Sequence, residues 1–188
     1  MASSTRYYLD KIYLVYFILH IPILFCVDLV PLYPASLWVP PSAPLHFLYD
    51  LRVYYIETYN DQFFAPPPAA IPSFFPLFAF LELVFHLPVS LWAVRALLGG
   101  GRGAKQSGLS GSAELLLLVY GIETALTTGT CMYEAFLWDP LVVTAQQKVV
   151  LLGGLYGGYL AVAILLTADM YVRLLGRLNT IDNIKKAQ

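Results

Sequence analysis

The sequence predicts an all-α membrane protein, a four-transmembrane-helix bundle with N and C termini cytosolic. Three observations lead to this fold class. The 188-residue chain is 59% hydrophobic and only 12% charged, with a mean hydropathy of +0.66, whereas a soluble domain carries about 25% charged residues. Four apolar stretches are long enough to cross a hydrocarbon core of about 30 Å. The basic residues gather on one side of these stretches, which sets the orientation.

The four stretches are the expected spans of a single domain that covers residues 1–188. A signal peptide is the other reading of the first stretch. We do not favour it, because Pro22 and Asp28 interrupt the stretch and no small-residue cleavage site follows it. The expected helices run over about 11–30, 71–98, 113–137 and 148–175.

The positive-inside rule orients these spans. Only Arg52 and Lys148 would lie on the second side of the membrane. The rule therefore places both termini and the middle loop in the cytosol and the loop 31–70 in the lumen. Nine basic residues share the first side: Arg6, Lys11, Arg95, Arg102, Lys105, Arg173, Arg177, Lys185 and Lys186.

The lumenal loop 31–70 contains a predicted amphipathic helix. Leu48, Leu51, Tyr55 and Tyr59 recur at helical spacing, and charged residues such as Arg52 fall on other faces. A helix of this kind lies at the membrane interface. It either covers the end of the bundle or acts as a lid over a cavity, and the sequence leaves both roles open.

The fourth span carries glycines in pairs, at Gly153, Gly154, Gly157 and Gly158. Small residues four apart allow another helix to approach closely. That helix belongs either to the same bundle, which we favour, or to a second copy in a homodimer. The cysteines match no metal pattern and are expected to be small core residues.

The last residues of the chain include Lys185 and Lys186, the fourth and third positions from its end. They resemble a dilysine signal for retrieval to the endoplasmic reticulum. Such a signal is read on a cytosolic tail, where the charge distribution places these lysines. We therefore expect a multi-pass protein of the endoplasmic reticulum membrane.

Three acids, Asp28, Glu82 and Glu123, fall within apolar spans. An ionisable group inside a membrane is expensive to place there and by default marks a functional site. A structural hydrogen-bond network is the alternative. Asp28 lies near the lumenal end of the first span, and Glu82 lies about 9 Å into the second, which runs back. Because side chains lean toward their own helix N-terminus, these two carboxyls approach one level.

Two carboxylates cannot both stay charged in a low-dielectric site, so we expect Asp28 and Glu82 to share one proton. Such a pair can accept a cationic amine or a hydroxyl. His20 and His86 each precede a helix-kinking proline by two residues, and either bond a freed backbone group or contact ligand. Thr124 and Tyr159 fall at mid-depth of their spans, where they could line the same cavity. The alternative for Thr124 is a hydrogen bond from its hydroxyl to the backbone of its own helix.

Other patterns indicate structure or exclude functions. Asp169 and Arg173, four apart near the end of the fourth span, form an expected structural ion pair, and Glu114 suits the N-terminus of the third helix. The net charge of −1 offers no basic field for nucleic acid. No nucleotide, metal or catalytic motif is recognisable. We therefore expect no cofactor, no metal and no nucleic-acid partner.

Two stretches, 20–28 and 82–88, resemble the EXPERA-domain family. They read His-Ile-Pro-Ile-Leu-Phe-Cys-Val-Asp and Glu-Leu-Val-Phe-His-Leu-Pro. Within the family they are most similar to the sigma-2 receptors, also called sigma intracellular receptor 2, and to fungal relatives named for efficient mitochondria targeting. The resemblance implies a bundle of the endoplasmic reticulum with a lipid-facing cavity that binds sterols, oxysterols or cationic amphiphiles.

The resemblance also implies roles for individual residues. Asp28 matches the acid that binds the ligand amine, and Glu82 the acid that supports it through a hydrogen bond. Asp61 resembles a lumenal acid that is also linked to ligand binding. His86 stands where the receptors usually have glutamine. Cavity-lining positions of the family match His20, Thr124 and Tyr159.

The sterol isomerases of the same family are the runner-up. Their histidine and one glutamate align with His20 and Glu82, but their second acid falls where this chain has Leu24, and their helix-four tryptophan is not evident. We therefore expect a binding protein without catalysis, with a role in lipid homeostasis or membrane-protein trafficking. A sterol Δ8–Δ7 isomerase and a non-enzymatic chaperone or scaffold are the two alternatives.

Overall fold

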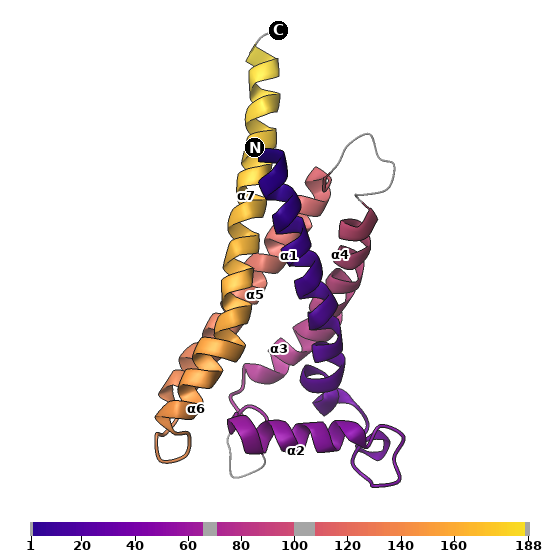
Figure 1. Ribbon diagram of the computed structural model, residues 1–188, viewed down its shortest axis with the longest axis vertical. Helices are drawn as coiled ribbons and strands as arrows, with labels where there is room; N and C mark the ends of the chain where they lie inside the picture. The colour runs from indigo at the N-terminus through magenta and orange to yellow at the C-terminus, as the bar shows by residue number, and fades with distance from the viewer. Residues whose placement is uncertain (1, 66–70, 100–107, 187–188) are drawn as a thin grey trace.

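The computed structural model describes residues 2–65, 71–99 and 108–186. Four of its helices are long and apolar enough to cross a membrane, which confirms the predicted all-α class and makes this a multi-pass membrane protein. Both ends of the chain lie at the same end of the bundle (Figure 1). The four spans are Ser4–Asp28, Phe75–Gly99, Gly111–Leu137 and Ala145–Lys186.

Three of the four spans contain a π-helical segment. In chain order, the first span joins α1 (Ala2–Ile23) to the π segment η1 (Leu24–Asp28). The second is α3 (Phe75–Leu81), η4 (Glu82–His86) and α4 (Leu87–Gly99). The third is the single helix α5 (Gly111–Leu137). The fourth is α6 (Ala145–Val149), η5 (Val150–Leu155) and α7 (Tyr156–Lys186).

Two of the π segments lie beside the prolines that were expected to disturb their helices. Pro22 precedes η1 by two residues, and Pro88 follows η4 by two. Proline cannot donate a backbone hydrogen bond, so the ladder nearby shifts to a wider turn. Asp28 ends η1 and Glu82 begins η4. Asp28 and Glu82 therefore both lie on π turns, which are frequent at functional sites, whereas Glu123 lies on the regular helix of the third span.

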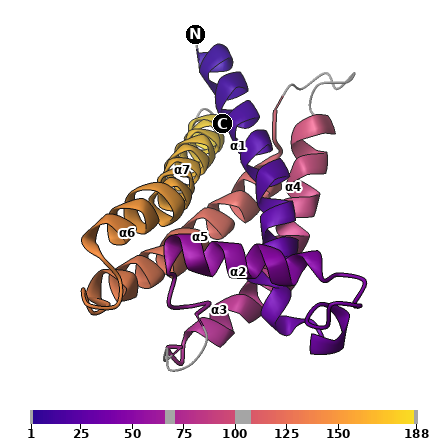
Figure 2. The same cartoon turned by 60° about the horizontal axis from the view of Figure 1, so that its bottom comes forward.

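The spans form two pairs. α1 packs against α4, and α5 packs against α7 along much of their length. Close packing of the second pair requires a glycine at Gly121, where a Cβ would lie 2.6 Å from Thr167 Oγ1. Toward the end opposite the termini the pairs diverge (Figures 1 and 2). A buried core joins the pairs nearer the termini: Tyr13, Phe17, Val89, Ala93, Leu109, Ala113, Leu117, Tyr120, Leu166 and Met170.

The predicted loop helix is present as α2 (Phe47–Tyr59), after two short 3-10 turns, η2 (Val30–Leu32) and η3 (Ala35–Leu37). It lies across the open end of the bundle (Figures 1 and 2). Asn60 ends it in the left-handed conformation, with φ of 53°. This turn sends Phe63 and Phe64 into a second buried cluster with Cys131 and Ala135.

The inner face of α2 differs from the prediction at two positions. Leu51 is 37% exposed, so it does not belong to the packed stripe. Arg52 lies toward the bundle instead: it donates a 2.9 Å hydrogen bond to the Phe64 carbonyl, and its guanidinium lies over the Phe64 ring. The long apolar stem of arginine can pack while its head finds a carbonyl, which a hydrophobic pattern does not reveal.

Three boundaries also differ from the prediction by more than three residues. The first helix begins at Ala2 rather than at about 11. The second span begins at Phe75 rather than at 71, and the fourth helix continues to Lys186 rather than ending near 175. α7 alone has 31 residues, about 46 Å of helix, because hydropathy sets the length of a span and not where helical hydrogen bonding stops. Most of the expected link between the second and third spans, and the run Pro66–Pro68, lie outside the described residues.

The glycines of the fourth span do not serve the helix packing that we favoured. A Cβ added to Gly153, Gly154 or Gly158 would meet nothing within 4 Å. These three positions are exposed and border open space, whereas a Cβ on Gly157 would meet the Leu152 carbonyl of its own span. Packing against a second copy stays a prediction. Cys131 is buried as expected, and Cys26 is half-buried.

Candidate functional site

A cavity of about 330 Å³ lies where the two helix pairs diverge, beneath α2. Residues from all four spans and from the α2 region line it. Most of its wall is apolar or aromatic, as in most small-molecule sites. Its aromatic side chains are Tyr55, Tyr59, Phe64, Phe75, Phe78, Tyr156 and Tyr159.

Both acids of the predicted pair line this cavity. Asp28 comes from η1 on the first span and Glu82 from η4 on the second. The antiparallel geometry thus brings them to one chamber, as expected. No direct hydrogen bond between the two carboxyls occurs within the described part of the chain, so the shared proton is not confirmed. Asp28 and Glu82 carry the only two carboxyl groups among the described residues that line the cavity.

The inner end of the cavity, farthest from α2, is polar. His20, His86, Thr124 and Tyr159 all line it, one from each span. His20 Nδ1 lies 3.2 Å from the Tyr159 hydroxyl. Thr124 donates a 2.8 Å hydrogen bond to the Tyr120 carbonyl, so its hydroxyl serves its own helix. The structure therefore brings together four residues that are far apart in sequence.

Glu123 lies behind this wall rather than in it. It is absent from the lining, and its Oε2 makes a close contact with His86 Nε2. Its other oxygen is buried and has no partner among the described residues. Glu123 was predicted to bind ligand. The structure places it against His86, outside the lining residues, and its contact with a ligand stays a prediction.

Asp61 is also outside the cavity, although it is fully buried. Its Oδ2 accepts hydrogen bonds from the hydroxyls of Tyr55 and Tyr156, at 3.0 and 2.6 Å, and its Oδ1 accepts one from the Phe63 amide. Burial raises the pKa of Asp61 above its ordinary value, although these three donors oppose the shift. Asp61 thus holds two tyrosines of the cavity wall in place.

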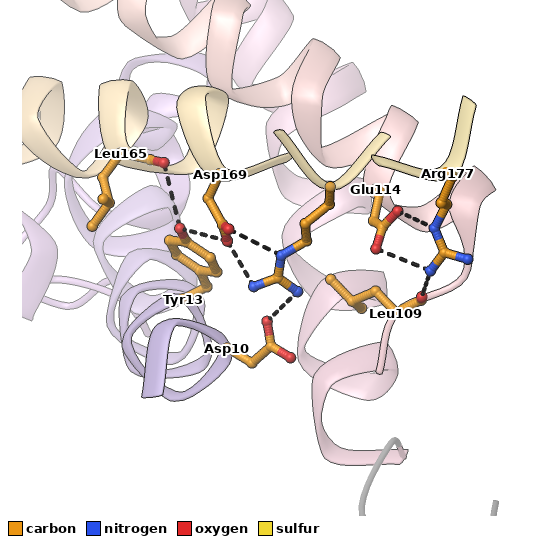
Figure 3. A network of polar contacts seen from close by, with 8 residues as sticks. Asp10, Tyr13, Leu109, Glu114, Leu165, Asp169 and Arg177 are labelled. Carbon is orange, nitrogen blue, oxygen red and sulfur yellow. Dashed lines mark hydrogen bonds and ion pairs between the residues drawn. The ribbon is translucent and has the colours of Figure 1, made fainter. Parts of the chain in front are cut away.

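A second polar network closes the end of the bundle that holds both termini (Figure 3). Arg173 pairs with Asp169 at 2.6 Å, as predicted, and also with Asp10 of α1 at 2.8 Å. Arg177 contacts Glu114 at 2.5 Å. Glu114 is 2% exposed, so its role is this ion pair as well as its place in the first turn of α5. α7 is tied in this way to α1 and to α5.

Several lining residues could not be identified from the sequence. Phe64 and Tyr156 reach the cavity because of the turn after α2 and the π segment η5, neither of which has a clear sequence signal. Thr127 and Thr128 lie one turn from Thr124 on α5, so helical spacing could have suggested them. The proposed retrieval residues Lys185 and Lys186 are exposed in the last turn of α7.

A protein family and several known proteins match most of the length of this chain. A family model described as EXPERA (EXPanded EBP superfamily) matches residues 47–170. The chain is 29% identical over 171 residues to Efficient mitochondria targeting-associated protein 19 of Schizosaccharomyces pombe, which covers 91% of this chain and 79% of that protein. It is 32% identical over 171 residues to Sigma intracellular receptor 2 of Xenopus tropicalis, covering 90% and 91%.

A shorter match is to Sigma intracellular receptor 2 of Homo sapiens, with 34% identity over 99 residues that cover 53% of this chain and 51% of that protein. The matches extend beyond the stretches 20–28 and 82–88 to all four spans and α2. They therefore confirm the resemblance that those two stretches indicated.

Proposed function

Because the chain belongs to the EXPERA family, in which it is related to sigma intracellular receptor 2, we propose that it binds sterols, oxysterols or cationic amphiphiles in its intramembrane cavity. Asp28 receives the polar or cationic group of the ligand, and Glu82 supports Asp28. The aromatic walls hold the apolar body. The protein acts as a sensor or carrier in lipid homeostasis or as an aid to membrane-protein trafficking, without catalysis.

The observation that carries this proposal is the position of two carboxyls, Asp28 and Glu82, on one largely apolar chamber. A carboxylate out of water is stabilised by an opposite charge or by hydrogen-bond donors. A lipophilic amine supplies both, and aromatic faces nearby attract its cation further. A cavity of about 330 Å³ falls within the usual range for small-molecule sites, roughly 300–1,000 Å³.

Location and orientation belong to the same proposal. We place the protein in the endoplasmic reticulum membrane, with the network of Arg173 and Arg177 at the cytosolic end and α2 in the lumen. The distribution of basic residues supports this orientation. The exposed Lys185 and Lys186 support retrieval to this membrane. The names of the relatives, an intracellular receptor and a mitochondria targeting-associated protein, are consistent with a role inside the cell.

A binding assay tests the proposal. Purified protein in detergent is titrated with radiolabelled tamoxifen, a cationic amphiphile, and unlabelled sterols compete. Asp28→Asn is expected to weaken amine binding about tenfold or more, because it removes a buried charge partner, and Glu82→Gln is expected to weaken it less. Glu57→Gln is the control, since Glu57 is exposed on α2. Equal affinity in all four proteins would refute the proposal.

One contact favours a second candidate function. The pair of His86 and Glu123 lies beside the cavity and offers a proton donor and acceptor. A sterol Δ8–Δ7 isomerase needs such groups. Growth of cells that lack this isomerase separates the two functions: an isomerase restores growth, whereas a binding protein does not. A scaffold without a ligand would keep its protein interactions in Asp28→Asn.

A further inference from the structure

The cavity is smaller than the ligands proposed for it. Its volume of about 330 Å³ has room for about 11 water-sized groups, at roughly 30 Å³ each. A sterol, or an amphiphilic amine such as tamoxifen, contains more than twice that number of non-hydrogen atoms. The cavity therefore encloses only part of such a molecule, and the remainder has to pass through an opening in the wall.

Neither end of the bundle offers this opening. Toward the termini the cavity is closed by the buried core, in which Phe17, Tyr120 and Leu166 are at most 1% exposed. At the other end α2 covers it, and Asp61 ties α2 to α7 through two tyrosine hydroxyls. A ligand too long for the cavity therefore leaves it sideways, between helices and into the membrane.

Ile23 of the first span marks the open part of the wall. It is 36% exposed, whereas all other described lining residues are buried or half-buried. It lies one turn after Leu19, which is 58% exposed and does not line the cavity. Ile23 therefore borders the cavity on one side and the membrane on the other.

The opening lies between the first and fourth spans. Ile23 follows Tyr16 by seven residues, so the two share one stripe of the helix. Near that stripe Tyr16 and His20 contact Tyr159 of the fourth span and close the seam nearer the termini. Leu155, one turn from Tyr159 toward α2, lines the cavity as Ile23 does. The seam on the α2 side of Tyr159 is therefore bordered by two apolar side chains.

The carboxyl groups determine which end of the ligand stays inside. Asp28 lies five residues beyond Ile23, about 7 Å closer to α2 along the helix. A polar or cationic group held by Asp28 therefore lies at the covered end, and a tail that leaves beside Ile23 runs toward the middle of the membrane. Because lipid is as favourable a solvent for that tail as an apolar cavity, enclosing the tail contributes little to affinity.

We propose that the cavity encloses only the polar end of its ligand, and that the apolar tail leaves between the first and fourth spans beside Ile23. The aromatic wall then holds only the part of the apolar body next to the polar group. The ligand class is a long amphiphile with its polar or cationic group at one end, and the length of its tail is not selected. This inference rests on the proposed binding function and makes Ile23 a residue that determines which ligands fit.

The test uses two amines with the same polar end. The short one, phenylpropylamine, is small enough to be enclosed, and the long one carries a dodecyl chain at the para position of the same ring. Binding of both tritiated amines is measured on the full chain in phosphatidylcholine nanodiscs. Ile23→Trp narrows the opening and is expected to weaken binding of the long amine about tenfold, with the short amine changed by less than about twofold. Leu19→Trp, on the outward face, is the control and is expected to leave both affinities unchanged.

A second measurement needs no variant, so it also covers the case in which Ile23→Trp does not fold. The long amine carries a diazirine at the end of its chain, and mass spectrometry locates the label after photolysis. The label that an excess of phenylpropylamine displaces reports the bound molecule. We expect this label on outward side chains of the first and fourth spans, such as Leu19, rather than inside the cavity.

Equal weakening of both amines in Ile23→Trp, no change for the long amine, or the same change in Leu19→Trp would overturn the inference. So would a wild type that binds only the short amine, or displaceable label deep in the cavity, as on Thr124. Asp28→Asn separates the two proposals, since it is expected to weaken both amines. If wild type binds neither amine, or Asp28→Asn binds both as well as wild type does, the proposed function fails. If both amines bind through Asp28 and only the passage at Ile23 is absent, the inference alone fails.

Discussion

The hydroxyl of Tyr156 at the start of α7 donates a 2.6 Å hydrogen bond to the carboxyl group of Asp61, in the loop that follows α2. Tyr55 of α2 donates to the same oxygen at 3.0 Å. Asp61 thus links the helix that covers the cavity to the fourth span. Because both tyrosines line the cavity and Asp61 does not, the shape of its covered end depends on an acid outside the lining.

Asp61→Asn is expected to destabilise the fold by about 1–3 kcal/mol. Both carboxyl oxygens of Asp61 now accept hydrogen bonds, and the amide would instead turn its N–H group toward one of those donors. Thermal and denaturant unfolding in detergent measure the change. Asp50→Asn is the matched control, since the side chain of Asp50 is 71% exposed. Equal loss of stability in both variants would contradict the role given to Asp61.

The pH dependence of stability has a definite sign at Asp61. Burial raises its pKa in the folded protein above the ordinary 3.8, so the folded state holds the proton more tightly than the unfolded chain does. The stability that this proton contributes is fully present below the ordinary pKa. It is lost as pH rises through the raised folded pKa.

The midpoint of thermal unfolding is therefore expected to fall as pH rises above 3.8, through a component that Asp61→Asn lacks. Unfolding scans of the two proteins across the acidic range measure it. The difference between their midpoints should change with pH. A constant difference would show that Asp61 has the same pKa in both states.

Gly121→Ala is expected to cost about 1–3 kcal/mol of stability, because the new methyl would lie 2.6 Å from Thr167 Oγ1 and 3.2 Å from the Ala163 carbonyl. Gly129→Ala on the same helix is the control. Its methyl meets nothing within 4 Å, and alanine favours helix over glycine by up to about 1 kcal/mol. Opposite signs for the two variants are predicted, and equal effects would contradict the close packing of α5 and α7.

Arg173→Met is expected to cost about 3–5 kcal/mol, because it leaves Asp10 and Asp169 without their partner. Adding Asp10→Asn and Asp169→Asn should recover a large part of that loss. Arg6→Met serves as the control, since Arg6 is exposed. Unfolding in detergent checks all three proteins. A triple variant no more stable than the single one would show that charge pairing is not the cause.

The sequence was sufficient to predict the four spans, because hydropathy over about 20 residues reports directly on the lipid environment. It was also sufficient to select Asp28 and Glu82, since acids are rare inside apolar helices. Their common chamber followed from antiparallel topology and helical rise alone. These inferences use only the hydropathy of the spans, their order along the chain and the membrane around them.

The remaining features depend on partners from distant parts of the chain. Asp61 and Glu123 were expected to bind ligand, but neither lines the cavity. Asp61 accepts a hydrogen bond from Tyr156 and Glu123 contacts His86, and both partners come from other parts of the chain. Arg52 turned toward the bundle because the chain reverses at Asn60 and presents the Phe64 carbonyl. Contacts of this kind have no local pattern, so only the packed structure shows them.

The most direct measurement identifies the molecules that remain bound in the cavity. Wild type, Asp28→Asn, Glu82→Gln and the control Glu57→Gln are purified in the same detergent, and their lipids are compared by mass spectrometry. We predict that wild type and Glu57→Gln retain a sterol or other amphiphile that the two cavity variants lose. The same lipids at the same amounts in all four proteins would contradict a ligand held by these carboxyls.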